Sequence, residues 1–335
     1  MFYVKSKNMA LKLDLKDRKL LYELDRNPRA TISTLARRVG VSKQVALYRI
    51  NSLCRQGVIS TSFAITDAAK LGFTLRKAFV KLQNASEEEE RALISWLLEN
   101  KETVWVASCE GQYDLAFSLR AKNIEEYTGK LWEIDNRFGH LFLQRDIAPI
   151  VRGQYFYRDY LVGNQAGTDR ELSFGSDPKQ SLELDLQDWK MLIELGKNAR
   201  APITALAKAT GTSPDAARKR LKRLESNGAI NGYALVLGNP SIGQLHYKVF
   251  VRLKSTKLRR YKQLVGFCRE HPNIFYIVKT FGVWEFEIDM EVPDSQAFRS
   301  VMRQLKSRFS DIMRDYSHIS IYKIHKYNFT PSVPD

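Results

Sequence analysis

The sequence predicts an α+β protein built from two copies of one module, each a helix-turn-helix (winged-helix-like) domain followed by a ferredoxin-like βαββαβ sensor domain. Three observations predict this class. Two long segments repeat at a constant offset, each copy opens with three short helical patterns around a glycine turn, and strand and helix patterns then alternate. The 44% hydrophobic and 27% charged residues are typical of a globular protein.

The repeat decides the architecture. The residues LDLKDRKLLYEL begin at Leu13 and LDLQDWKMLIEL begin at Leu184, which is an offset of 171 residues. The same offset pairs Gly111 with Gly282 far downstream, inside GQYDLAFSL and GVWEFEIDM. The repeating unit is therefore the whole two-part module.

These patterns place the domain boundaries. The stretch between the copies is rich in Gly, Ser, Asp and Gln, which predicts a flexible linker. We expect helix-turn-helix domains at residues 10–60 and 182–231, sensor domains at 61–162 and 232–331, and the linker at 163–181.

Each first domain carries the start and stop signals of three helices. Aspartate and small hydroxyl residues are good N-caps, and glycine tolerates the positive φ of a tight turn or a helix end. The predicted caps of the first two helices are Asp17, Ser33, Asp188 and Thr204. The predicted turn glycines are Gly40 and Gly211, followed by the third-helix caps Ser42 and Ser213 and the terminating glycines Gly57 and Gly228.

The outward face of each third helix is the candidate DNA-reading surface. A helix in the major groove uses its N-terminal residues on base edges and its cationic flanks on phosphates. The candidates in copy one are Ser42, Lys43, Gln44, Leu47, Tyr48 and Arg49. The candidates in copy two are Ser213, Asp215, Arg218, Lys219, Arg220 and Lys222. Because copy two is more basic, either the two heads prefer different half-sites or copy two mainly grips the DNA backbone. The alternative is that these residues are solvated positions on a protein-interaction module.

The second part of each copy predicts a four-stranded antiparallel sheet with two helices on one face. The strand patterns KAFVKL and YKVFVRL open it, and a strand pair turns near each repeat-paired glycine, Gly111 or Gly282. The other face of such a sheet needs a cover, and a partner sheet is the simplest one. The two copies can pair within one chain or between chains, and the sequence leaves both open.

Charge and cysteine usage narrow the function classes. The net charge of +16 indicates a polyanionic partner, which is usually nucleic acid. Three cysteines without a CxxC pair indicate reduced thiols, and the five histidines form no metal-binding pattern, so we expect no metal and no cofactor. The start has no signal-peptide pattern and no apolar run is long enough for a membrane helix, so we expect a cytoplasmic protein without a membrane partner. Either Met1 or Met9 can be the start.

The joint order of these motifs resembles the leucine-responsive/asparagine-regulator (Lrp/AsnC) family of bacterial and archaeal transcription factors. The resemblance rests on DxxDxxxLxxL, LAxxxGxS and RIxxLxxxGVI or RLxxLxxxGAI, and on the GxYD motif, and it covers nearly the whole chain twice over. It implies binding of double-stranded DNA, homo-oligomers, and an amino acid or similar effector near the GxYD turn. The effector candidates that it implies are Gly111, Tyr113, Asp114, Gly282, Trp284 and Glu285.

Two departures from the family pattern and three alternative interpretations stay open. Family members usually carry one module per chain, and copy two reads GVWE where copy one reads GQYD. The glycine turns can be purely structural. The resemblance also includes sirohaem decarboxylases of haem synthesis, which would need histidines converging on the sensor, yet His140 and His318 are not equivalent under the offset. An architectural chromatin-like protein is a third reading, while nucleotide-binding and Ser-His-Asp motifs do not occur.

Overall fold

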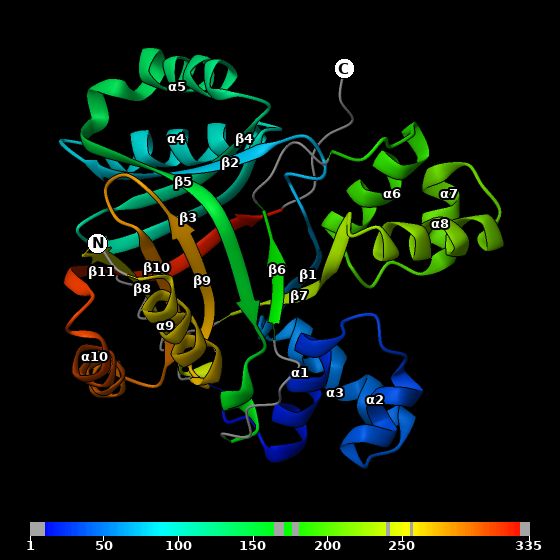
Figure 1. Ribbon diagram of the computed structural model, residues 1–335. Helices are drawn as coiled ribbons and strands as arrows, with labels where there is room; N and C mark the ends of the chain where they lie inside the picture. The colour runs from blue at the N-terminus through cyan, green and yellow to red at the C-terminus, as the bar shows by residue number, and fades with distance from the viewer. Residues whose placement is uncertain (1–10, 164–170, 176–180, 239–241, 255–256, 329–335) are drawn as a thin grey trace, which may run out of the picture.

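The duplication extends to every described α-helix and β-strand of the two modules. The computed structural model describes residues 11–163, 171–175, 181–238, 242–254 and 257–328 (Figure 1). Copy one contains α1 (Leu15–Arg26), α2 (Ile32–Val39), α3 (Lys43–Arg55), β1 (Ile59–Thr66), β2 (Thr74–Leu82), α4 (Glu87–Glu99), β3 (Thr103–Gly111), β4 (Leu115–Ala121), α5 (Ile124–Phe138) and β5 (Phe142–Phe156). Copy two contains α6 (Leu186–Lys197), α7 (Ile203–Thr210), α8 (Pro214–Ser226), β7 (Ile230–Leu237), β8 (Leu245–Leu253), α9 (Leu258–Glu270), β9 (Ile274–Thr280), β10 (Phe286–Val292), α10 (Ser295–Phe309) and β11 (Met313–Tyr327).

The two sensor sheets join into one closed barrel. Each half has the ferredoxin-like strand order, β5-β2-β4-β3 in copy one and β11-β8-β10-β9 in copy two. Strand β3 pairs with β11, and β5 pairs with β9, so the ends of one half bond to the ends of the other. The prediction of two simple ferredoxin-like domains is corrected in this respect, because closure leaves no edge unpaired between the halves.

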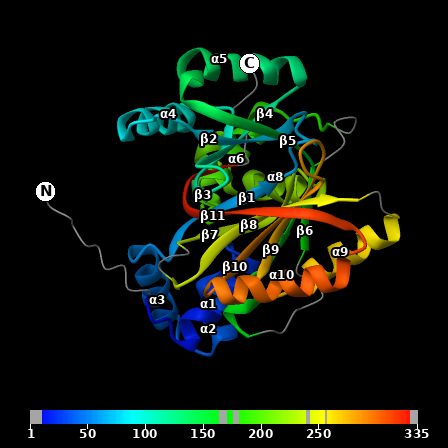
Figure 2. The same ribbon diagram turned by 90° about the vertical axis from the view of Figure 1, so that its left-hand side faces the viewer.

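The helices of the sensors lie outside this barrel. Helices α4 and α5 cover one side and α9 and α10 cover the opposite side, so the inner faces of both sheets form a shared interior (Figure 2). The two copies thus pair within one chain, which is one of the two arrangements that the sequence left open.

A second, two-stranded sheet ties the helical domains together. Strand β1 pairs antiparallel with β7, so the strand after each third helix bonds to the other copy instead of forming a wing hairpin in its own head. Each head also packs on the strand of the other copy. Leu235 and Leu237 of β7 join the core of α1–α3, and Phe63 and Ile65 of β1 join the core of α6–α8.

Two repeat-equivalent arginines add hydrogen bonds between the heads. The Arg29 guanidinium donates to the carbonyls of Ala199 (2.5 Å) and Ala201 (3.1 Å), and Arg200 donates to the carbonyl of Pro28. Because each contact crosses from one copy to the other, the two heads form a single pseudo-symmetric unit.

The helix caps differ in part from the prediction. Helices α1 and α6 begin at Asp14 and Asp185, whose carboxylates accept from the backbone N–H of Asp17 and Asp188. The predicted caps Asp17 and Asp188 instead stand three residues later and complete a capping box. The second helices are capped by Thr31 and begin after Pro202, not at Ser33 and Thr204. Either aspartate of a DxxD pair can accept a hydrogen bond from the free backbone N–H groups at a helix start. The sequence pattern alone therefore did not tell which of the two is the N-cap.

The predicted linker is not wholly without structure. Within residues 163–181, the segment β6 (Glu171–Phe174) pairs with β5 beside the barrel, while residues 164–170 and 176–180 lie outside the described part. The three cysteines are free thiols. Among the described residues, no helix is long and apolar enough to cross a membrane.

Candidate functional site

The third helix of copy one presents a mixed apolar and polar face to solvent. Ser42 begins it, with Oγ accepting from the N–H of Val45 (3.2 Å), and Gly40 supplies the turn before it at φ +72°. Ala46, Ile50 and Leu53 are buried, as predicted. The opposite face carries the exposed residues Lys43, Gln44, Leu47 and Tyr48. Tyr48 is 68% exposed and lies beside the exposed Val45 and Leu47, so this face carries an apolar patch of the kind that partners cover.

The third helix of copy two presents a basic face. Ser213 begins it, with Oγ accepting from Ala216 (3.2 Å), and Pro214 occupies the first turn. Its exposed polar residues are Asp215, Arg218, Lys219, Lys222 and Arg223. Arg218 forms an ion pair with Asp215 (2.5 Å), but both side chains stay more than half exposed, so this pair is easily exchanged.

Two predicted DNA contacts, Arg49 and Arg220, are already engaged. Arg49 binds the carboxylates of Asp14 (2.7 Å) and Asp17 (2.8 Å) at the start of α1. Its repeat equivalent Arg220 binds the corresponding acids at the start of α6, at 2.6 and 2.5 Å. These arginines therefore hold the third helix against the first helix of their own head, and the sequence could not show it because the acids lie more than 30 residues away.

The GxYD turn of copy one is packed from several sides. Gly111 has φ +122°, and a Cβ there would lie 3.3 Å from the carbonyl oxygen of His318. Tyr113 is buried and donates to Asp146 (2.5 Å), and burial together with this bond raises the pKa of the tyrosine. The Asp114 carboxylate accepts from Lys81 (2.7 Å) and the N–H of Leu82 (2.9 Å).

The corresponding turn of copy two is packed in the same way. Gly282 has φ +109°, and the buried Trp284 donates from Nε1 to Glu287 (3.1 Å). Glu285 accepts from the N–H of Leu253 (2.7 Å). Rings of both turns, Tyr113 and Trp284, meet with centroids 6.3 Å apart. The structure therefore brings the two turns that were predicted to bind an effector close together. They meet in a shared aromatic core, and the carboxylates of Asp114 and Glu285 already have hydrogen-bond partners within the protein.

The sequence reasoning missed a set of charged side chains inside the barrel. Lys77 and Lys248 are repeat equivalents, and Lys77 donates to Glu287 (2.5 Å). Lys248 pairs with Asp289 and, at 3.3 Å, with Glu287. His246 Nε2 lies 2.7 Å from Asp289 Oδ1. The alternate acids in FEIDMEV were the available signal, since every second residue of a strand shares a face, but the pattern did not tell which face is inside.

A second buried cluster joins the barrel to the first head. Arg158 binds Glu291 through Nε (2.7 Å) and Asp25 of α1 through Nη1 (2.8 Å), and its backbone N–H donates to the second oxygen of Asp25 (2.9 Å). Tyr155 also donates to Asp25 (2.7 Å), and Tyr160 donates to Glu291 (2.6 Å). Gly196 stands at the position equivalent to Asp25 in copy two, so only head one has this connection.

His140 and His318, the two histidines weighed for a decarboxylase activity, both lie outside the lining of the barrel cavity. His140 is largely exposed, with Nε2 3.7 Å from Glu89, and His318 packs beside Phe298 at 4.8 Å between ring centroids. Neither lines the barrel cavity, where His246 is found instead. In the part of the chain that the structure describes, no three His, Cys, Asp or Glu side chains gather to hold a metal ion.

Comparisons with known proteins match both heads and both modules. A model described as winged helix-turn-helix DNA-binding matches residues 13–60, and one described as an AsnC-type helix-turn-helix domain matches residues 184–225. The chain is 27% identical over 151 residues to the proline dehydrogenase transcriptional activator of Rhodobacter capsulatus, covering 45% of this chain and 97% of that protein. It is 30% identical over 115 residues to an uncharacterized HTH-type transcriptional regulator of Pyrococcus horikoshii, covering 34% of this chain and 77% of that protein.

One solved structure shares the two-module arrangement. The siroheme decarboxylase NirDL matches 95% of this chain and 94% of its own, with a TM-score of 0.60 and 11% sequence identity. At that identity the match establishes a common fold and nothing about chemistry.

Proposed function

Because this chain belongs to the AsnC-type helix-turn-helix family of transcriptional regulators, we propose that its two heads engage one double-stranded DNA site together. The exposed faces of α3 and α8 carry the proposal. Each helix has a serine as its N-cap, and the outer side of each helix is exposed to solvent in the described structure. A helix presented in this way fits the major groove.

The two heads would read the site differently. On α3, Gln44 suits an adenine edge, and Leu47 and Tyr48 offer apolar contact to thymine methyl groups. On α8, Arg218, Lys219 and Lys222 suit phosphates. We therefore propose an asymmetric operator in which α3 supplies most of the sequence preference and α8 most of the backbone affinity.

The connection between the heads favours joint binding. The β1–β7 pairing and the reciprocal bonds of Arg29 and Arg200 hold the two helical domains at one spacing. A rigid pair loses less freedom on binding than two independent heads, so both halves of the site should be bound in one step.

The effector that the family resemblance implies is also part of the proposal. Binding of an amino acid at the turns of Gly111 and Gly282 would require Asp114 or Glu285 to exchange its present partner for the ligand's ammonium group. Titration of amino acids into the wild-type chain and an Asp114→Asn variant tests this, because only a ligand held by that carboxylate loses affinity in the variant.

The shared fold with NirDL supports one alternative, a sirohaem decarboxylase-like activity. The described barrel cavity has about 50 Å³ of space, far below the size of a porphyrin, and His246 is the one histidine on its wall. Mixing the chain with sirohaem distinguishes the two functions. An enzyme of this kind would give a shifted Soret band at stoichiometric ratio, whereas the regulator would leave the spectrum of free sirohaem unchanged.

The decisive experiment measures DNA binding of the full chain against salt. Duplexes selected from a random pool by the wild-type protein serve as probes in fluorescence anisotropy. Replacing Arg218 and Lys222 by alanine should weaken binding and flatten the log–log salt dependence by about 0.9 for each phosphate that the variant no longer neutralises. The matched control replaces Lys262 and Arg303, two exposed cations on the outer helices α9 and α10, and should leave the slope unchanged.

Two results would overturn the proposal. One is that the folded wild-type chain retains no duplex from the pool even at low salt. The other is an equal loss of affinity in the head variant and the control variant, since that would mean only net charge matters.

A further inference from the structure

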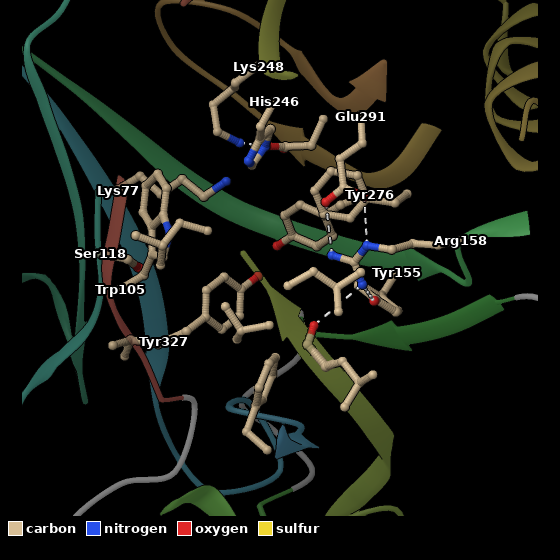
Figure 3. Close-up of a pocket in the computed structure, with 18 of the residues that line it drawn as sticks. Lys77, Trp105, Ser118, Tyr155, Arg158, His246, Lys248, Tyr276, Glu291 and Tyr327 are labelled. Atoms are coloured by element: carbon tan, nitrogen blue, oxygen red, sulfur yellow. Dashed lines mark hydrogen bonds and ion pairs between the residues drawn. The ribbon is translucent and has the colours of Figure 1, made fainter. Parts of the chain in front are cut away.

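The barrel encloses a cavity that the two copies and the β1–β7 sheet line together (Figure 3). About 50 Å³ of it is open to the centre of a water molecule, which leaves room for a few water molecules or one small organic ion. Aromatic side chains form much of its wall, with Trp105, Tyr276 and Tyr327 among them. The rest of the wall is mostly aliphatic, but it includes Lys77, Arg158, Lys248, Asp289 and Glu291, and charged side chains are unusual in the interior of a small barrel.

The polar wall has hydrogen-bond donors to spare. The Lys77 ammonium group carries three N–H bonds but meets a single acceptor, Glu287, and otherwise faces the rings of Trp105 (5.9 Å) and Tyr276 (5.3 Å). Its side chain is only 5% exposed, so bulk water does not complete its hydrogen bonding. The nearby acids are occupied, Asp289 by Lys248 and His246.

His246 has an unpartnered nitrogen in the same space. Its Nε2 is engaged with Asp289, while its Nδ1 is buried without a hydrogen-bond partner. Figure 3 shows Lys77, Lys248 and His246 converging on one side of the cavity. A buried polar atom without a partner is costly, and a ligand that completes its hydrogen bonding recovers that cost.

We propose that this cavity is a binding site for a small monocarboxylate, held between Lys77 Nζ and His246 Nδ1. Lys77 donates one of its free N–H bonds to the ligand carboxylate and keeps its ion pair with Glu287, while the ligand gives His246 Nδ1 the hydrogen-bond partner that it lacks. A carboxylate group matches the available volume, and a short apolar body lies against Trp105 and Tyr327. A free organic acid and an amino acid share this chemistry.

A groove on the surface provides the entrance. It is lined by residues that include Ser60, Gly238 and Lys323, and it shares Ile324 and His246 with the cavity. His246 and Ile324 thus form the partition between the groove and the cavity, and we place the ligand's entry there, beside β11.

Arg158 connects the site to the first head. It lines the cavity and binds Asp25 of α1, while copy two has no equivalent acid. An anion in the cavity attracts Arg158 and competes with Asp25 for it, so occupancy weakens the attachment of head one to the barrel and changes how the paired heads meet DNA. This step rests on the proposed DNA-binding function, whereas ligand binding itself does not.

The binding test uses calorimetric titration of the full chain with acetate, propionate, glycine and L-alanine, with propionamide as the uncharged control. We expect saturable one-to-one binding of at least one carboxylate and none of propionamide. Preferred binding of L-alanine identifies the amino-acid source, and preferred binding of propionate identifies the free acid.

Variants locate the site. Lys77→Met should weaken binding at least tenfold, and Lys279→Met, at an exposed lysine on β9, should not. If Lys77→Met does not fold, as judged by circular dichroism, Ile324→Trp takes its place, because it plugs the entrance at a half-buried position. Absence of saturable binding by the wild-type chain, or unchanged binding in these cavity variants, overturns the site.

The coupling is measured separately. In the presence of saturating ligand, the affinity of wild-type protein for its selected duplex should change at least threefold, and Ile324→Trp should not respond. Ligand binding without any change in DNA affinity overturns the coupling through Arg158. Failure to bind any DNA overturns the regulator proposal, while the calorimetric result still decides the cavity.

Discussion

Replacing Arg158 by methionine should destabilise the protein by about 4 kcal/mol at pH 7.5. The Arg158 side chain is 5% exposed and its partners Asp25 and Glu291 are 0% and 1% exposed, so the variant leaves two carboxylates buried without a cation. Breaking such a pair typically costs about 3–5 kcal/mol. Protonation limits the loss, because neutralising a carboxylate about 3 pH units above its ordinary pKa costs about 4 kcal/mol.

Because protonation of a buried carboxylate limits the loss, the destabilisation of the variant should depend on pH. One of the two orphaned carboxylates takes up a proton in the native variant, so the destabilisation should shrink by about 1.4 kcal/mol per pH unit, or about 2.8 kcal/mol between pH 7.5 and 5.5. Urea denaturation of both proteins at the two pH values measures this. Arg152→Met, an exposed position on β5 six residues earlier in the chain, is the control and should cost less than about 0.5 kcal/mol.

A loss below about 1 kcal/mol for Arg158→Met, or an equal loss at both pH values, would refute the reasoning. It would mean that water reaches Asp25 and Glu291 in the native protein, and that the cluster does not hold head one to the barrel.

Three further predictions concern the barrel charges and the head contacts. Burial lowers the pKa of Lys77 to about 8, so between pH 8 and 10.5 the unfolded chain holds more protons than the native one. The free energy of unfolding should therefore rise by up to about 3 kcal/mol over this range. A Lys77→Met variant should lack this rise when unfolding is measured in urea. Burial raises the pKa of Asp289, but the neighbouring Lys248 outweighs this effect and holds that pKa well below its ordinary 3.8. The ion pair's contribution to stability is therefore complete above about pH 4 and declines as the pH falls further. Thermal scans from about pH 6 to 2 should show a falling melting temperature, and a constant one would contradict the prediction. Replacing both Arg29 and Arg200 by alanine should increase hydrogen exchange at the β1–β7 pairing and weaken DNA binding, while unchanged exchange would show that the two strands alone hold the heads.

Local signals predicted the helix-turn-helix units well. Ser42 and Ser213 cap their helices, and Gly40 and Gly211 adopt the left-handed conformation that the turn requires. These features depend on a few neighbouring residues, which is why composition and spacing were sufficient. The predicted caps were misplaced by three residues at α1 and α6 because an adjacent acid offers the same chemistry.

The roles of individual charges could not be predicted in the same way. Arg49 was predicted to contact DNA, but it binds Asp14 and Asp17 across the head. Lys77 resembles any lysine on a half-exposed strand, yet it is buried in the barrel. In both cases the deciding partner lies far away in the chain, and only the packing of elements brings it within hydrogen-bond distance.

By itself, the sequence determined the duplication, the helix-turn-helix units and the βαββαβ order, because each is written in local periodicity or in the constant offset of 171 residues. Only the tertiary structure decided that the two sensor sheets close into one barrel, that β1 and β7 cross between copies, and that Lys77, His246 and Arg158 share an interior. The side-chain pattern of a strand does not identify the strand with which it pairs, because the pairing is made by backbone N–H and C=O groups that nearly all residues share. The partner is therefore chosen by the packing of the whole chain.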